Sequence, residues 1–228
     1  MSLYAISDLH LALSMEKPMD VFGEHWYKHD EKIKNNWVSK IREDDTVLIA
    51  GDISWSMKME EGLKELEWIH NLPGRKILIK GNHDYWWQSI TKLNKLYEDM
   101  NFIQNNYYSY ENYAICGTRG WICPGGENFI SHDKKIYERE QIRLKLSLDS
   151  AVKAGYNKFI VMLHYPPTNE KFIETEFIRI LKDYNVEKVI YGHLHGPSLN
   201  KVFTGKIDGV EYILTSADYI NFNPVKIL

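Results

Sequence analysis

The amino-acid sequence predicts an α/β fold with two sheets, and two observations lead to this prediction. Short apolar runs alternate with helical patterns along most of the chain, which is typical of α/β domains. The segments 101–117 and 209–220 have no intervening helix, and their β-branched and aromatic residues indicate hairpins. We therefore expect a second, partly antiparallel sheet beside the first.

The individual elements follow from the spacing of apolar residues. Short apolar runs predict strands at 3–6, 46–50, 76–79, 158–163 and 188–191. Apolar residues three and four positions apart predict four helices. One face of each helix is marked by Ile33, Trp37, Val38 and Ile41; Leu63, Leu66 and Ile69; Ile90, Leu93, Leu96 and Met100; and Ile173, Phe177, Ile180, Leu181 and Tyr184. A long charged helix is expected over residues 133–154.

Length and charge restrict the class of protein. A chain of 228 residues suits a single domain, 1–228, with a possible lid segment around 118–135. The 28 basic and 31 acidic residues argue against a long nucleic acid as partner. No apolar run approaches the roughly 20 residues that cross a bilayer, and the first residues lack the pattern of a signal peptide. We expect a cytoplasmic protein with no membrane partner, in which Cys116 and Cys123 are reduced, packed thiols.

Polar residues gather just past the ends of the predicted strands. The carboxyl ends of strands are where open α/β sheets build ligand sites, so we expect these residues to converge. They are Asp8, His10, Asp52, Asn82, His83, Asp84, His164, His193 and His195. Their carboxylate, imidazole and amide groups suit Mn, Fe, Zn or a related divalent ion, and the absence of thiolates argues against a structural zinc knot.

Two pairs of these residues have a spacing that brings side chains together. Residues i and i+2 of an extended segment point to the same side, so we expect Asp8 to act with His10, and His193 with His195. Each motif alone is weak evidence, because a single histidine after a strand is more often a hydrogen-bonded structural residue. The ordered set favours a metal site. The other histidines are interpreted as surface imidazoles: His25, His29, His70 and His132.

The ordered series of motifs resembles the calcineurin-like metallophosphoesterase superfamily. It reads Asp8-Leu9-His10, Gly51-Asp52, Gly81-Asn82-His83-Asp84, His164 and Gly192-His193-Leu194-His195. The stretches GDISW and GTRGW are similar to a bacterial subgroup of predicted phosphohydrolases. Ser54 and Trp55 stand where the protein Ser/Thr phosphatase branch has an Asp-Arg pair, which argues against that specificity. The resemblance implies a four-layer α/β/β/α sandwich with two mixed β-sheets.

The resemblance also implies a dinuclear metal centre. One ion would be held by Asp8, His10, Asp52 and His195, and the other by Asp52, Asn82, His164 and His193, with Asp52 as the bridge. The cofactors would be two divalent ions, with manganese, Fe, Zn, Co and Ni all compatible with these ligands. His83 would be a catalytic residue near the phosphate and not a ligand.

These expectations lead to a metal-dependent hydrolase of small phosphoric esters, either a phosphomonoesterase or a phosphodiesterase. A hydroxide activated by both metals would attack phosphorus directly. His83 would protonate the leaving alkoxide or stabilise the phosphoryl oxygens. Asp84 could orient His83, and an exposed loop carboxylate is the alternative. The alternatives are a nucleotide phosphodiesterase or nuclease, and a non-catalytic scaffold of the same fold. The complete ligand set argues against the scaffold.

Aromatic and basic residues near the motifs are candidates for substrate binding. Trp55, Trp86, Trp87 and Trp121 could wall the site and stack a base, sugar or aryl group, although we expect core packing for at least half of them. Arg119 is a candidate phosphate clamp, because guanidinium matches phosphate geometry, and a surface arginine is the alternative. The sequence makes no prediction of the oligomeric state.

Overall fold

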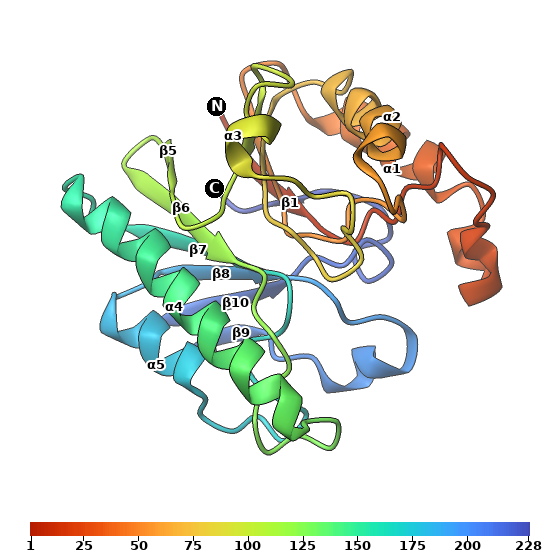
Figure 1. Ribbon diagram of the computed structural model, residues 1–228. Coiled ribbons are helices and arrows are strands. Elements are labelled where there is room, and N and C mark those ends of the chain that lie inside the picture. The colour runs from red at the N-terminus through yellow and green to blue at the C-terminus, as the bar shows by residue number, and fades with distance from the viewer.

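Two β-sheets pack face to face in the computed structural model, which describes residues 1–228 (Figure 1). The first sheet contains β1 (Leu3–Ile6), β2 (Thr46–Ile49), β3 (Arg75–Leu78) and β4 (Met100–Phe102), all parallel, and β11 (Val225–Lys226), which runs antiparallel to β1. The strand order is β11-β1-β2-β3-β4. The end of the chain therefore returns to the sheet in which it began.

The second sheet also has a parallel centre and has the strand order β5-β6-β7-β8-β10-β9. Its four parallel strands are β6 (Tyr113–Thr118), β7 (Phe159–Leu163), β8 (Lys188–Tyr191) and β10 (Val210–Leu214). Antiparallel strands form both edges, β5 (Tyr108–Tyr110) and β9 (Gly205–Ile207). The predicted hairpins are thus present at β5–β6 and β9–β10, whereas residues 215–220 form no strand.

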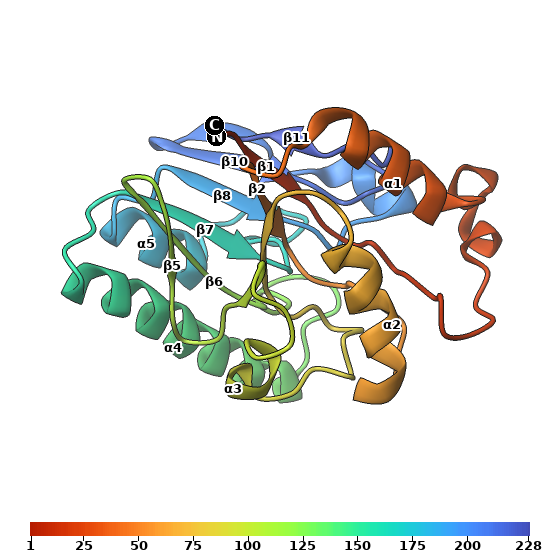
Figure 2. The ribbon, with the colours of Figure 1, turned by 90° about the horizontal axis from the view of Figure 1, so that it is seen from above.

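Helices cover the outer face of each sheet (Figures 1 and 2). The first sheet is covered by α1 (His29–Lys40) and α2 (Met59–His70), and the second by α4 (Ser131–Lys153) and α5 (Glu176–Asp183). The remaining helices are short: α3 (Ile90–Leu93) and the 3₁₀ helices η1 (Met19–Phe22), η2 (Glu24–Trp26) and η3 (Gly196–Lys201). No helix combines the length and the apolar composition that crossing a membrane requires.

Three apolar cores fill the spaces between the four layers. Successive residues of a strand point to opposite faces of its sheet, so β1 can serve two cores at once. Ala5 packs between the sheets with Ile160 and Met162 of β7. Ile6 faces outward into the core that includes Trp37 of α1 and Leu66 of α2. The α/β/β/α sandwich with two mixed sheets is therefore confirmed.

The helix predicted over residues 90–100 is wrong beyond its first turn. The chain leaves the helix after Leu93, and Met100 begins β4. The side chain of Asn94 accepts a hydrogen bond from the backbone N–H of Phe102 at 2.9 Å, which anchors the turn. Met100 and Phe102 are fully buried in the edge strand. Burial of these side chains beside β3 outweighs the local helical spacing.

The carboxyl ends of the parallel strands in both sheets lie at one edge of the sandwich. The end of β1 is joined to the end of β10, because the backbone N–H of Ser7 donates to the carbonyl of Thr215 at 2.8 Å. The ends of β8 and β7 are joined in the same way, by a 3.1 Å bond from Gly192 N–H to the carbonyl of His164. The loops that carry the polar motifs therefore meet.

Candidate metal centre

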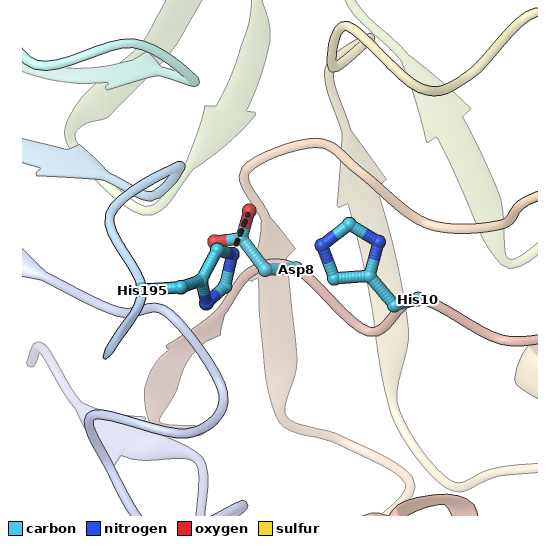
Figure 3. A group of neighbouring side chains, drawn as sticks. All are labelled: Asp8, His10 and His195. Atoms are coloured by element: carbon cyan, nitrogen blue, oxygen red, sulfur yellow. Dashed lines mark ion pairs between the residues drawn. The ribbon is translucent and has the colours of Figure 1, made fainter. Parts of the chain in front are cut away.

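Three side chains from two strand-end loops form the first of two candidate ligand groups (Figure 3). Asp8 and His10 follow β1, and His195 follows β8. Their candidate ligand atoms all lie within 4.8 Å of one another, and Nε2 of His195 is 3.4 Å from Oδ1 of Asp8. Asp8 is fully buried, and the backbone N–H of His193 donates to its carboxylate. The backbone of the loop after β8 thus holds the side chain of Asp8, which belongs to the loop after β1.

Asp52, His164 and His193 form the second group, at the ends of β2, β7 and β8. Nε2 of His164 lies 3.3 Å from Oδ2 of Asp52 and 2.8 Å from Oδ1 of Asn82. Nδ1 of His164 is hydrogen-bonded to the carbonyl of Ala50 at 3.0 Å. This bond orients the imidazole so that Nε2 faces the site. Asn82 therefore lies with this group, as its motif predicts.

Asp52, a member of the second group, also faces the first group. Its Oδ2 is 3.9 Å from Nε2 of His10 and 3.3 Å from Nε2 of His164. Its Oδ1 accepts a hydrogen bond from the backbone N–H of His83 at 2.8 Å. One carboxylate oxygen therefore faces both groups, while the other holds the loop after β3.

Four of these residues have a left-handed backbone conformation. The φ angles are 57° at Asp8, 46° at His10, 51° at Asp52 and 73° at His193. Such conformations cost non-glycine residues roughly 1–3 kcal/mol each and cluster at functional sites. The prediction that Asp8–His10 and His193–His195 are extended is therefore wrong. Asp8 still groups with His10, but through left-handed backbone conformations and not through strand alternation.

Glycine at two positions lets the loops approach this closely. Gly51 has a φ of 90°, a region that favours glycine. A Cβ atom on Gly81 would overlap the backbone nitrogen and the carboxylate of Asp52. The Gly-Asp and Gly-Asn-His-Asp motifs thus need their glycines because the two loops are in direct contact.

Charge complementarity shifts the pKa values of the buried groups. Burial alone would raise the pKa of Asp8 and of Asp52, yet the imidazoles beside them hold both well below their usual range. Burial opposes the charged form of His164 and His195, but the adjacent carboxylates raise the pKa of His164 to about 9 and that of His195 to about 10. The site therefore favours positive charge close to its two carboxylates.

The donor set fits divalent metal ions. Burial lowers the pKa of His10 to about 4 and that of His193 to about 3, so both are neutral at pH 7, the form in which imidazole binds metal. Nδ1 of His10 and Nε2 of His195 are buried and have no hydrogen-bond partner. The approach of His195 to Asp8 is thus an ion pair without hydrogen-bond geometry. Nε2 of His195 beside Asp8 and Nε2 of His10 beside Asp52 are imidazole nitrogens of the kind that bind Mn, Fe, Zn and related ions.

A sequence model of the calcineurin-like phosphoesterases matches residues 1–197 of the chain. The chain belongs to this family. The match includes both candidate ligand groups, and the family resemblance of the motifs is confirmed. The protein is a phosphoesterase of the hydrolase class, from a family that normally uses divalent metals.

Individual relatives of this phosphoesterase are distant. The gene 66 protein of Mycobacterium phage L5 is 40% identical over 78 residues, which are 34% of this chain and 37% of that protein. The gene 66 protein of Mycobacterium phage D29 is 24% identical over 205 residues, 89% of this chain and 83% of that protein.

Two solved structures are similar to it over nearly their whole length. A protein of unknown function from Aquifex aeolicus has a TM-score of 0.54 at 18% identity, with 99% of this chain and 95% of that chain covered. The phosphopantetheinyl hydrolase from Mycobacterium tuberculosis has a TM-score of 0.58 at 13% identity, with 100% and 95% covered. At these identities the likeness shows the shared fold.

A further carboxylate supports the first ligand group of the phosphoesterase. Oδ1 of Asp218 lies 2.8 Å from Nδ1 of His195, so the other ring nitrogen of His195 faces Asp8. A carboxylate in this position orients a histidine ligand and raises its basicity. Sequence reasoning missed Asp218, although it follows β10 and strand-end position was the available signal.

His83 and Asp84 are adjacent in sequence but have different surroundings. Nε2 of His83 lies 4.0 Å from Oδ2 of Asp52, and its side chain is 35% exposed beside the site. Asp84 is fully buried, and its carboxylate accepts hydrogen bonds from the backbone N–H groups of Ile53 and Gly81 at 2.9 and 2.7 Å. It accepts two more, from Ser54 N–H and from the indole of Trp86. Asp84 makes no bond to the His83 ring, so the structure does not contain the predicted orienting contact.

The candidate tryptophans divide between the site and the core. Trp55 lines a cavity of about 330 Å³ together with His10 and Asp52, and its ring stacks on that of His10 at 4.7 Å. Trp86 is 1% exposed and packs in the core under α2. Its assignment to substrate binding is wrong, because it lies beneath the loop and not in the cavity. Trp87 is also buried.

Sequence analysis selected only some of the aromatic residues in and near this cavity. Trp26 lines it although sequence reasoning did not select this residue. Trp121 lies in a neighbouring groove of about 320 Å³, with Tyr165 and His193. His193 lines both spaces, and the ring of Tyr165 in the groove lies 4.0 Å from that of His193 and 5.0 Å from that of Trp121.

The segment proposed as a lid joins β6 to α4. Its loop is hydrogen-bonded to the loop after β7, through Asn169 to the carbonyl of Pro124 at 2.9 Å and through Lys171 to that of Gly125 at 2.8 Å. It forms one wall of the groove that contains Trp121. Closure of residues 118–135 over the site stays a prediction.

One of the remaining histidines differs from its interpretation as a surface residue. His29 is buried, and its Nε2 lies 3.3 Å from the carbonyl of His10. His25 is exposed, as interpreted, and lines the cavity with Trp26. The segment of η2 packs against the first ligand group through Trp26, whose ring lies 6.0 Å from that of His10 and 5.8 Å from that of His195.

Proposed function

We propose that the protein hydrolyses phosphoric esters at a dinuclear metal centre. The first ion would be held by Asp8, His10, Asp52 and His195, and the second by Asp52, Asn82, His164 and His193. The observation that carries the proposal is the position of Asp52, whose Oδ2 faces an imidazole of each group at 3.9 and 3.3 Å. A single carboxylate oxygen shared in this way is the arrangement that a bridging ligand requires.

Two divalent ions, when bound, lower the pKa of water and offset the charge on phosphoryl oxygens in an in-line displacement. The side chains of this protein supply the other functions. His83 reaches the cavity from the loop after β3, where it can transfer a proton to the leaving alkoxide, and burial lowers the pKa of its ring. Asp84 holds that loop against the loop after β2 through its backbone bonds, and so acts as a positioning residue.

The cavities indicate a small ester with an organic group. The groove that contains Trp121 and Tyr165 lies against His193 and offers aromatic surface for a leaving group. The solved structure from Mycobacterium tuberculosis is named a phosphopantetheinyl hydrolase, which adds phosphopantetheinyl esters to the candidate substrates. A phosphodiester places organic groups on both sides of phosphorus, and the cavity with Trp55 would receive the second. The choice between monoester and diester, and a cytoplasmic location, stay predictions.

A nucleotide phosphodiesterase is included in this proposal, because a base could stack on Trp55 or Trp121. The formal net charge of −3 argues against a long polynucleotide. A non-catalytic scaffold is disfavoured, since both ligand groups have all their donors.

Metal content and hydrolysis test the proposal together. After loading with Mn²⁺ or Zn²⁺, we expect two ions per chain and turnover of p-nitrophenyl phosphate or bis(p-nitrophenyl) phosphate. Asp52→Asn should lower both metal content and activity by at least about a hundredfold, because it removes a ligand from both ions. Asp44→Asn changes an exposed carboxylate, 66% accessible, and serves as the matched control. Full activity of Asp52→Asn would refute the dinuclear proposal.

A further inference from the structure

A basic cavity lies at the ends of β3 and β6, beside the metal groups. It has a volume of about 210 Å³ and is lined by Lys80, Arg119, Arg139, Arg143 and Glu140, among others. Lys80 and Arg119 follow the two strands, and the other three residues belong to α4. The cavity is distinct from the one that contains His10 and Asp52.

Glu140 is the only carboxylate that lines this basic cavity. It is fully buried, and its Oε1 lies 2.9 Å from Arg143, 3.2 Å from Arg139 and 3.6 Å from Arg119. Its Oε2 accepts a hydrogen bond from the hydroxyl of Thr118 at 2.6 Å. One negative charge is therefore shared by three guanidinium groups, and positive charge remains in excess.

Two of the cations have donors that no protein group uses. Nε of Arg119 is buried without a hydrogen-bond partner, and the whole side chain is 17% exposed. Lys80 is half-buried and forms no hydrogen bond or ion pair. Leaving a buried charged donor such as Nε of Arg119 unpaired is costly, which indicates that something else accepts its bond, and Lys80 adds an ammonium group that no protein group engages. Arginine and lysine donors around one small cavity fit the oxygens of a phosphoryl group.

The basic cavity is connected to the candidate metal centre through the backbone and through aromatic rings. Lys80 directly precedes the Gly-Asn-His-Asp motif. The carbonyl of Arg119 accepts hydrogen bonds from the backbone N–H groups of His164 and Tyr165, at 3.0 and 2.9 Å. The guanidinium of Arg119 lies 4.4 Å from the ring of Trp121, which is next to Tyr165. The residues that line the basic cavity are therefore direct neighbours of the loops that carry the candidate metal ligands.

We infer that the basic cavity binds a second phosphoryl group of the substrate, one that is not hydrolysed. The inference rests on the proposed phosphoesterase activity, and it narrows the substrate class to esters with an additional phosphate. Arg119 then acts as a phosphate clamp at a distance from the reacting phosphorus and not at the metal centre.

Binding of pyrophosphate to the metal-free protein tests the cavity without relying on activity. Metal is removed by chelation and dialysis, so the carboxylates of the ligand groups repel the probe. Calorimetry should show binding that weakens by about tenfold or more in Arg143→Gln and in Lys80→Gln, because each loses a charged donor. Lys80→Gln breaks no contact within the protein, so it covers the case in which Arg143→Gln fails to fold. Arg179→Gln on α5, 58% exposed, is the matched control and should bind as the wild type does.

Kinetics with matched esters test whether the bound anion belongs to the substrate. Alkanediol bisphosphates of increasing length are compared with the corresponding monophosphates, using the metal-loaded enzyme. We expect kcat/KM of the bisphosphate to exceed that of the monophosphate by about tenfold at one spacer length, and this advantage to disappear in Lys80→Gln.

The outcomes are distinct. Absence of pyrophosphate binding, or binding unchanged in both variants, would overturn the anion site. Binding without any preferred spacer length would overturn its assignment to the substrate. Intact pyrophosphate binding in a metal-loaded protein that hydrolyses no ester would instead refute the proposed function.

Discussion

Nδ1 of His195 lies 2.8 Å from Oδ1 of Asp218, and Nε2 of the same ring lies 3.4 Å from Oδ1 of Asp8. The imidazole is thus held between a carboxylate outside the ligand group and one inside it. Asp218→Asn should lower metal affinity about 10- to 100-fold, because the ring loses the partner that sets its orientation. Metal titration followed by fluorescence or calorimetry measures this change. Asp208→Asn, 62% exposed, is the control, and equal affinity in both variants would contradict the role of Asp218.

His83 and Asp84 should separate activity from stability. His83→Asn is expected to lower kcat by about 10²- to 10⁴-fold, as loss of a proton-transfer group does, with little change in the free energy of unfolding. Asp84→Asn places an amide against buried N–H donors, including those of Ile53 and Gly81, and should lower the free energy of unfolding by about 2 kcal/mol or more. Urea unfolding and steady-state kinetics on both variants measure the two effects. A stable but inactive Asp84→Asn variant would show that Asp84 acts in catalysis and not in positioning the loop.

Trp55 and Trp86 should also separate an effect on substrate binding from an effect on stability. Trp86 is 1% exposed, and Trp86→Ala should cost about 3–5 kcal/mol of unfolding free energy because it leaves a cavity under α2. Trp55 lines the cavity beside His10, so Trp55→Ala should raise KM for aryl phosphates while costing much less stability. Thermal unfolding and KM together test the division. If Trp55→Ala changed stability alone, the substrate role of Trp55 would be excluded.

Cys116 and Cys123 should be unreactive in the folded protein. Both thiols are free and buried, and burial raises the pKa of each to about 12. Reaction requires the thiolate, so we expect alkylation at pH 8 to occur only after unfolding in urea. Mass spectrometry counts the modified cysteines. Rapid labelling of the native protein at either position would contradict this packing.

The same two thiols should make the free energy of unfolding fall as the pH becomes alkaline. Unfolded cysteines ionise near pH 9, whereas the folded protein retains both protons until about pH 12. The unfolded state therefore binds fewer protons in this window, and the free energy of unfolding falls as pH rises from 9 towards 12. Replacing Cys116 by Ala should make this fall shallower. Urea unfolding between pH 8 and 10 compares the slopes, and identical slopes would show that Cys116 does not contribute.

Much of the fold was predictable because it depends on local spacing. The apolar runs at 3–6 and 188–191 are strands in the structure, and α4 (Ser131–Lys153) occupies the predicted range within two residues. The helix predicted over 90–100 fails because Met100 and Phe102 gain more burial in a strand beside β3. Local periodicity carries no information about such a partner.

The residues of the candidate centre were predictable for a different reason. A polar side chain after a buried strand is conspicuous in sequence, and the strand ends of both sheets meet at one edge. The role of Asp84 and the burial of Trp86 were not predictable, because side chains six and eight residues after the end of β3 can turn towards the cavity or away from it. Sequence analysis missed Asp218 because no motif surrounds it, although it follows β10 just as the other candidate residues follow their strands.

By itself the sequence determined the α/β class, the positions of five strands along the chain and the chemical identity of the candidate metal donors, because these depend on residue type and spacing along the chain. Only the tertiary structure decided how the donors divide into two groups with Asp52 between them. It alone placed Lys80, Arg119 and Arg143 around one cavity, although they are far apart in sequence. Left-handed turns at the strand ends and face-to-face packing of the sheets create both arrangements, and neither is encoded in any single motif.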